Sequence, residues 1–171
     1  MIENNDSNEY FSFFTETETL SILPKTILLE EGKVADRLYL IRKGCLRLFF
    51  YNEGKDMTFQ FFFEGDFVAS FDSLYKRQPS LFFLESIELT EVSMIKRDDF
   101  YNLIEMIPSL RKKYEEKLIE RFHVYQQLFL SRINNTPQQR YEELLKERPD
   151  GGFPNIILHL ILALLPYLYP E

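Results

Sequence analysis

The chain has 171 residues, of which 45% are hydrophobic and 16% aromatic, so it can bury a core without disulfides and is not intrinsically disordered. The net charge of −7 is a poor match for a nucleic-acid-binding protein, and the single cysteine, Cys45, excludes an internal disulfide and a cluster held by four thiolates. Met1–Ser12 is acidic and polar rather than basic and apolar, so no secretory signal is expected there and a reducing, cytoplasmic location is predicted.

Short strands separated by glycine turns are predicted between Ile22 and Ile95. The clearest of them are Leu38–Ile41, Cys45–Tyr51, Met57–Phe63 and Leu81–Ile87. The intervening turn signals are Lys43-Gly44, Asn52-Glu53-Gly54-Lys55 and Glu64-Gly65-Asp66. In the second strand Leu46 and Leu48 fall on one face and Arg47 on the other, which is the alternation of a half-buried strand. This part of the chain therefore predicts a β-sandwich or barrel.

Helices are predicted after Ile95. Asp98 or Asp99 can cap a short helix that runs to Met106, and Pro108 can occupy the first turn of a longer helix. The longer helix has an apolar stripe at a spacing of three and four residues, formed by Leu110, Tyr114, Leu118, Phe122, Tyr125, Phe129 and Ile133. Asn134-Asn135 ends it. Thr136-Pro137-Gln138-Gln139 is then a capping box that opens a further helix to about Arg148.

The block from Arg37 to Gly44 (RLYLIRKG), the Asn52–Asp56 hairpin turn (NEGKD) and Glu64–Phe67 (EGDF) resemble, in order and spacing, the β-roll of Crp/Fnr-type bacterial transcription regulators. The resemblance covers roughly residues 24–133. It implies a mainly β fold, a jelly-roll domain of the cyclic-nucleotide-binding kind, followed by C-terminal helices. The expected segments are an N-terminal segment 1–20, a β-roll 21–107, a dimerisation helix 108–134, and a remnant of a helix-turn-helix domain with an aberrant apolar tail, 136–171.

Relatives that bind a cyclic nucleotide are expected to carry a Gly-Glu pair after the Gly-Asp-Phe motif and an Arg followed by Ser or Thr further on. The aligned positions here are Ala69-Ser70 and Ser80-Leu81, so the residues that would hold the ribose and the phosphate are missing. Arg77 lies three residues before Ser80 and could reach inward. The resemblance therefore implies a ligand pocket that has lost affinity for cyclic nucleotides. Its expected lining residues are Phe67, Ala69, Ser70, Phe71, Arg77, Ser80, Leu81 and Phe83. Phe71, Phe82 and Phe83 would fill the pocket or shape it for an apolar ligand, or they simply pack in the core.

The sequence lacks the residues that a metal site, a haem site or a catalytic site would need. The two histidines, His123 and His159, lie outside the β block, so a cupin-type metal site in an unrelated jelly roll has no ligands. His123 is interpreted as a surface or interface histidine rather than a haem ligand. No nucleophile paired with a base is visible. We therefore expect no metal, no cofactor and no enzymatic activity.

The apolar stripe of the long helix is too apolar to face water, so it packs on the β-roll, on a second copy of the chain, or on both. The resemblance favours a parallel pair of helices in a homodimer. The expected interface residues are Leu110, Tyr114, Leu118, Phe122, Tyr125 and Phe129, and aromatic side chains of this kind are enriched at interfaces.

The charge is uneven along the chain. Residues 1–110 carry a net charge of −8, whereas residues 111–148 carry +3, which fits either a solvated helix surface or the remnant of a DNA-facing end. Asn155–Glu171 has no basic residue, so as written it is a poor DNA reader, and its apolar stretch is too short to span a bilayer.

Codons consistent with the segment Asn155–Glu171, read two bases further on, can spell HYIASYLGITPVSLSR, which looks like a helix-turn-helix of this family. A frameshift near Gly151-Gly152 is therefore one hypothesis, and a genuine apolar helix that docks on the body is the other. DNA is a partner only if the C-terminal domain is intact in the native gene.

Two functions remain open. One is the effector-sensing and dimerisation part of a Crp/Fnr-type regulator, with an unknown small-molecule effector and no competence for DNA binding as written. The other is a stand-alone β-roll that binds a ligand or another protein. No membrane association is expected for either.

Overall fold

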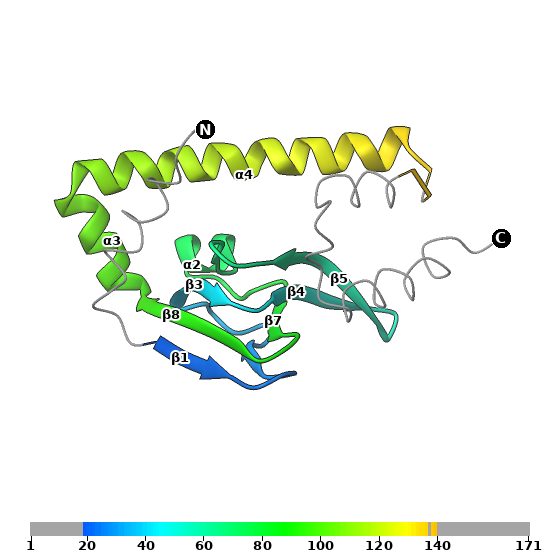
Figure 1. Cartoon of the computed structure of the whole chain (residues 1–171), viewed down its shortest axis with the longest axis horizontal. Helices are drawn as coiled ribbons and strands as arrows, with labels where there is room; N and C mark the ends of the chain where they lie inside the picture. Colours follow the sequence, from blue (N-terminus) through cyan, green and yellow to red (C-terminus); the bar gives the residue numbers. More distant parts are fainter. Residues whose placement is uncertain (1–18, 137, 140–171) are drawn as a thin grey trace. The chain divides into compact units, whose positions relative to one another are not determined.

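A computed structural model describes residues 19–136, 138 and 139 of the chain (Figure 1). The predicted N-terminal segment up to residue 18, the helix expected beyond Gln139 and the apolar tail lie outside the described residues. The chain divides after Arg111 into two units, 1–111 and 112–171. The described part contains antiparallel sheets followed by helices, so the predicted fold class is confirmed.

Two four-stranded antiparallel sheets form the first unit. One sheet has the order β1-β8-β3-β6, with bounds Thr19–Ile22, Thr90–Lys96, Arg37–Lys43 and Phe67–Val68. The other has the order β2-β7-β4-β5, with bounds Ile27–Leu29, Phe83–Ser86, Leu46–Asn52 and Lys55–Phe62. Strands that are neighbours in a sheet come from distant parts of the chain, as β3 and β8 do in Figure 1. This is the order of a wound β-roll rather than of a meander.

The core lies between the two sheets and follows the alternation of the strands. Leu46 and Leu48 of β4 and Leu84 of β7 point into it, and each is at most 4% exposed. Arg47 lies on the opposite face of β4, as the sequence predicts. The other core members come from both sheets: Tyr39, Ile41, Phe62, Val68 and Val92. Burial of these side chains is the main favourable term for the fold.

The four clearest predicted strands all exist, with shifted ends. β3 and β5 are longer than predicted, whereas β7 starts two residues later than predicted and leaves Leu81 outside it. Four further strands, β1, β2, β6 and β8, have no counterpart among the four clearest sequence signals. β6 has only two residues, which is too short for an alternating pattern to be recognised.

Gly44 occupies the turn between β3 and β4 with a φ of +95°. A Cβ atom there would lie 2.8 Å from the Leu89 carbonyl oxygen and 2.8 Å from Thr90 Oγ1. The Gly44 amide donates to Glu64 Oε1 at 2.8 Å. Both the backbone conformation and the close approach therefore require glycine at this position.

Three helices complete the described part. α2 (Phe71–Lys76) was not expected from the sequence, and α3 (Arg97–Met106) packs against β8 and β3 through buried residues that include Phe100 and Ile104. The prediction that Asp98 or Asp99 caps α3 is wrong, because Lys96 is the N-cap residue and makes no side-chain capping bond. Both aspartates lie in the first turn instead, where a negative charge favours the positive end of the helix dipole.

The long helix α4 (Pro108–Asn134) begins and ends where the sequence predicts. The capping box that follows it is also confirmed. Thr136 N donates to Gln139 Oε1 at 2.8 Å, and Gln139 N donates to Thr136 Oγ1 at 3.3 Å. Among the helices of the described residues, none is both long and apolar enough to cross a membrane.

Candidate ligand-binding site

The two segments that the sequence analysis singles out meet at a pair of buried serines. Ser70 lies two residues after the end of β6 and is the N-cap residue of α2, while Ser80 lies in the loop that leads from α2 to β7. Their hydroxyl oxygens are 2.9 Å apart, and the two residues are 5% and 3% exposed. A ligand group that bound either hydroxyl from the interior would have to compete with this hydrogen bond.

Ser80 is held from several sides. Its amide donates to the Lys33 carbonyl and its carbonyl accepts from the Gly32 amide, each at 2.8 Å. Its hydroxyl lies 2.7 Å from the Phe82 carbonyl oxygen and accepts from the Phe82 amide at 3.1 Å. Since a hydroxyl carries one hydrogen, Ser70 must donate to Ser80 whenever Ser80 donates to Phe82.

Ser73 anchors the middle of α2. Its hydroxyl accepts from the Ala35 amide at 2.9 Å and donates to the Gln78 carbonyl. Ser73 is 2% exposed. All three buried serines of this region therefore satisfy groups of the protein itself, as buried polar groups normally do.

Arg77 does not join the serine pair. Its backbone is left-handed, with φ +55°, and its guanidinium donates to Asp98 Oδ1 at 2.6 Å on the surface. Asp98 also accepts from Arg97 at 2.8 Å. The hydrogen bond from Arg97 is the main reason that the pKa of the Asp98 carboxyl lies below its usual value, and Arg77 adds to the effect.

The other predicted lining residues are divided between different environments. Ala69 is buried beside Ser70, and Phe67 and Phe71 are half-buried. Leu81 is 70% exposed. Phe83 lies on the face of β7 that points away from the core, where its ring stacks on Phe49 at 4.9 Å between centroids. The structure thus brings Ala69, Ser70 and Ser80 together, and it brings neither Arg77 nor Phe83 to the serine pair.

Phe82, two residues after Ser80, packs on the core and contacts two further rings. Its ring stacks on Phe59 at 4.7 Å and meets the edge of Phe50 at 6.1 Å. Phe59 and Phe50 were not predicted as site residues, because they lie in β5 and β4, before the segments that the family resemblance singled out. The backbone of Phe82 is thus bonded to Ser80, while its ring belongs to an aromatic cluster with Phe59 and Phe50.

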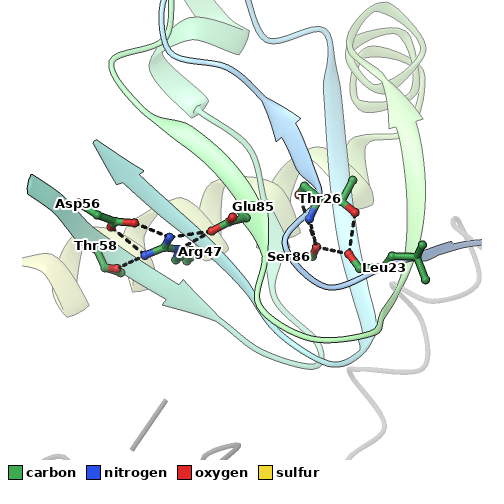
Figure 2. A network of polar contacts seen from close by, with 7 residues as sticks. All are labelled: Leu23, Thr26, Arg47, Asp56, Thr58, Glu85 and Ser86. Atoms are coloured by element: carbon green, nitrogen blue, oxygen red, sulfur yellow. Dashed lines mark hydrogen bonds and ion pairs between the residues drawn. The ribbon is translucent and has the colours of Figure 1, made fainter. Parts of the chain in front are cut away.

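Arg47 is the only charged side chain that is buried among the described residues, and it lies on the outer face of β4 (Figure 2). Its guanidinium binds both oxygens of Asp56 at 2.9 and 2.7 Å and Glu85 Oε2 from two nitrogens, and it donates to Thr58 Oγ1 at 2.9 Å. Burial alone would lower the pKa of Arg47, but the bonds to Asp56 and Glu85 outweigh it and the pKa is raised. Because its partners already bind this arginine fully, it offers no positive charge to a phosphate.

A second polar cluster, also drawn in Figure 2, fixes the start of β2. The Ser86 hydroxyl donates to the Leu23 carbonyl at 2.6 Å and accepts from the Thr26 amide at 2.9 Å. Thr26 Oγ1 also donates to the Leu23 carbonyl, at 2.7 Å. These bonds hold the turn before β2 against β7 and have a structural role.

The predicted interface residues of α4 differ in exposure. Leu110, which belongs to the first unit, is 5% exposed, and Tyr114 and Tyr125 are half-buried. Leu118, Phe122 and Phe129 are exposed, by 39%, 62% and 66%. Ile133 of the same stripe is exposed as well, and so are Ile119 and Leu130. In the described residues, no group of His, Cys, Asp and Glu side chains could hold a metal ion.

Comparison with known families and proteins agrees with the observed β-roll fold. The family model of the cyclic nucleotide-binding domain matches residues 19–106. The cAMP-activated global transcriptional regulator CRP of Salmonella typhimurium is 26% identical over 101 residues, which are 58% of this chain and 48% of that protein. The homologue from Klebsiella aerogenes matches equally well. The chain spans about half the length of the curated relatives it matches.

Solved structures with a similar fold include the catabolite activator protein of Thermus thermophilus, with a TM-score of 0.61 and 20% identity over 74% of this chain and 59% of that one. Another is the c-di-GMP-responsive global regulator CLP of Xanthomonas campestris, with a TM-score of 0.66 and 15% identity over 83% and 72% of the two chains. At these identities the likeness concerns the fold alone.

Proposed function

The chain belongs to the cyclic nucleotide-binding domain family, and from this premise we propose that it is the effector-sensing part of a Crp/Fnr-type transcription regulator whose site does not bind cyclic AMP. The Ser70–Ser80 hydrogen bond is the observation that supports the absence of cyclic AMP binding. At these two positions, the family resemblance calls for a carboxylate that binds the ribose and an arginine that neutralises the phosphate. Here two hydroxyls bind each other instead.

The electrostatics support the proposal. A cyclic phosphate that is removed from water needs a cation or several hydrogen-bond donors to offset its lost hydration. Arg77 is bound to Asp98 on the surface, and Arg47 is bound to Asp56 and Glu85 on the other face of the sheet. The Phe82 amide already donates to Ser80 Oγ. Neither arginine is therefore available to neutralise a phosphate at the serine pair.

The effector of such a site is an unidentified small molecule other than a cyclic nucleotide. The backbone of Phe82 is bonded to Ser80 and its ring packs against Phe59 and Phe50, which favours an apolar molecule that carries a hydrogen-bonding group. The structurally similar regulator CLP from Xanthomonas campestris responds to c-di-GMP, a cyclic dinucleotide, so a protein of this fold can respond to a molecule other than cyclic AMP. Neither a cofactor nor enzymatic activity is part of the proposal.

We further propose that the protein is cytoplasmic and forms a homodimer through the exposed apolar side chains of α4. As written, residues 155–171 contain no Lys or Arg, so we propose that this sequence does not bind DNA. A stand-alone β-roll for ligand or protein binding is the alternative. Recoding the tail into the shifted frame separates the two, because tight, salt-sensitive promoter binding by the recoded protein alone would favour the regulator.

Thermal unfolding of the full chain with millimolar cyclic AMP or cyclic GMP tests the central proposal. A ligand that binds only the native state raises stability by about 2.7 kcal/mol at a concentration of 100 times its dissociation constant. We expect no change in Tm with either nucleotide, while the Salmonella relative serves as the positive control. A Tm that rises with nucleotide concentration would overturn the proposal.

A further inference from the structure

The short helix α2 is bound at both of its ends. At the N-terminal end, the Ser70 hydroxyl is hydrogen-bonded to Ser80. At the C-terminal end, Arg97 Nε donates to the Leu74 carbonyl at 2.6 Å and Arg97 Nη2 lies 3.4 Å from the Tyr75 carbonyl. Arg97 thus satisfies carbonyl groups that the end of a helix leaves without an intrahelical partner.

Arg97 is also the first residue of α3. Its amide donates to the Asp36 carbonyl at 2.8 Å, its guanidinium lies 4.6 Å from the centroid of the Tyr101 ring, and it donates to Asp98 at 2.8 Å. The Tyr101 ring in turn is 6.5 Å from the ring of Tyr75 on α2. One side chain therefore joins the last turn of α2 to the first two turns of α3.

Because α2 has only six residues, its two ends belong to about one and a half turns of helix and cannot move independently. Ser80 is the less movable partner at the N-terminal end, since its backbone is bonded in both directions to Gly32 and Lys33. A group that separates the two hydroxyls therefore displaces Ser70 and α2 more readily than it displaces Ser80.

We propose that Arg97 is a positioning residue through which a displacement of α2 reaches α3, so that separating Ser70 from Ser80 changes the order of α3 by way of Arg97. The biological meaning of this coupling rests on the proposed function, in which the effector occupies the serine pair. The physical coupling itself needs no ligand, because substitution at the pair imitates the loss of the hydrogen bond.

Hydrogen exchange of the full chain, measured peptide by peptide, tests the coupling. Ser70→Ala removes the bond to Ser80. We expect faster exchange in peptides that cover residues 71–76 and, by roughly threefold or more, in peptides that cover 97–106. In an Arg97→Met background the variant should still change residues 71–76 but produce no additional change in 97–106. Methionine retains an apolar stem against Tyr101 while it loses every donor.

Arg77→Met is the matched control. It also removes a bond to Asp98, but Arg77 makes no bond to the carbonyls of α2, so Ser70→Ala should alter residues 97–106 in this background as in the wild type. Ser80→Ala breaks the same bond from the other side and replaces Ser70→Ala if that variant does not fold. Unchanged exchange in either peptide region with Ser70→Ala, or an equal response of 97–106 with and without Arg97, would overturn the proposal. Cyclic nucleotides do not enter the experiment, so its outcome is independent of the ligand test above.

Discussion

The hydroxyl oxygens of Ser70 and Ser80 lie 2.9 Å apart, and the side chains come from opposite ends of the segment that contains α2. Each serine occupies a position where the family resemblance calls for a charged residue. The pair is therefore both a stabilising contact and the place where a cyclic nucleotide would need a carboxylate and a guanidinium.

Introducing an arginine at Ser80 and a glutamate at Ser70 should give the site the two charged groups that cyclic AMP binding needs. Ser80→Arg alone buries an unpaired guanidinium and should lower the free energy of unfolding by about 3 kcal/mol. Adding Ser70→Glu supplies a partner and should recover at least half of that loss, as measured by urea unfolding. We expect cyclic AMP to raise the Tm of the double variant only. No recovery on adding Ser70→Glu would contradict the expected pairing of the two introduced charges.

Gly44 should tolerate no side chain. Gly44→Ala combines a positive φ with contacts below 3 Å to backbone atoms of Leu89 and Thr90, so we expect it to destabilise the protein by roughly 3 kcal/mol. Gly32→Ala is the control, because Gly32 also has a positive φ (+82°) but a Cβ atom there would have no neighbour within 4 Å, and this change should cost only about 1 kcal/mol. Equal losses in urea unfolding would show that the close approach has no energetic role.

Removing the guanidinium of Arg47 should leave two carboxylates facing each other. Glu85 is the more buried partner, with a side chain 13% exposed, so we expect Arg47→Met to lower the free energy of unfolding by about 3 kcal/mol. Adding Glu85→Gln should return part of this loss. Lys76→Met, which breaks the exposed Lys76–Asp72 pair, should cost less than about 0.5 kcal/mol. If Lys76→Met and Arg47→Met lower the free energy of unfolding by the same amount, the Arg47 cluster is not a major source of stability.

The ion pairs of Asp98 should make stability depend on pH in the acid range. The pKa of Asp98 is lower in the folded protein than its usual value of 3.8. Its contribution is therefore present above about pH 4 and is lost as the pH falls through the folded-state pKa. Unfolding free energies of the wild type and Asp98→Asn should differ at pH 6 and converge at low pH. Added salt should shrink the difference, because the pair is exposed. The neighbouring variant Asp99→Asn is the control.

The proposed homodimer predicts a specific sensitivity on α4. Phe122 is 62% exposed, and Phe122→Glu would place a charge among the apolar side chains of the interface. We expect the dissociation constant to rise at least about tenfold, equivalent to 1.4 kcal/mol, in sedimentation equilibrium. Gln127→Glu adds the same charge five residues further on, on another side of the helix, and should leave the dimer intact. A wild-type protein that sediments at 20.6 kDa would refute the dimer.

Local sequence patterns predicted strands and helices well where burial alternates regularly along a strand or where a helix end has a characteristic residue. The alternation around Arg47 predicted its face correctly, Pro108 marked the start of α4, and the pair Thr136 and Gln139 forms the expected capping box. The site was predicted less completely. β6 and α2 are too short for periodicity to be recognised, and Leu81 and Phe83 do not share the environment of Ser80.

The sequence by itself determined most strands, the glycine turns and the long helix, because these depend on residues that are neighbours in the chain, and its resemblance to a known family indicated the β-roll. Only the tertiary structure decided which side chains meet: Arg47 with Glu85 across 38 positions, Arg77 with Asp98 across 21, and Ser70 with Ser80. The physical reason is that a hydrogen bond or an ion pair forms between groups that sheet pairing and helix packing bring within about 3 Å of each other, and no local pattern contains that distance.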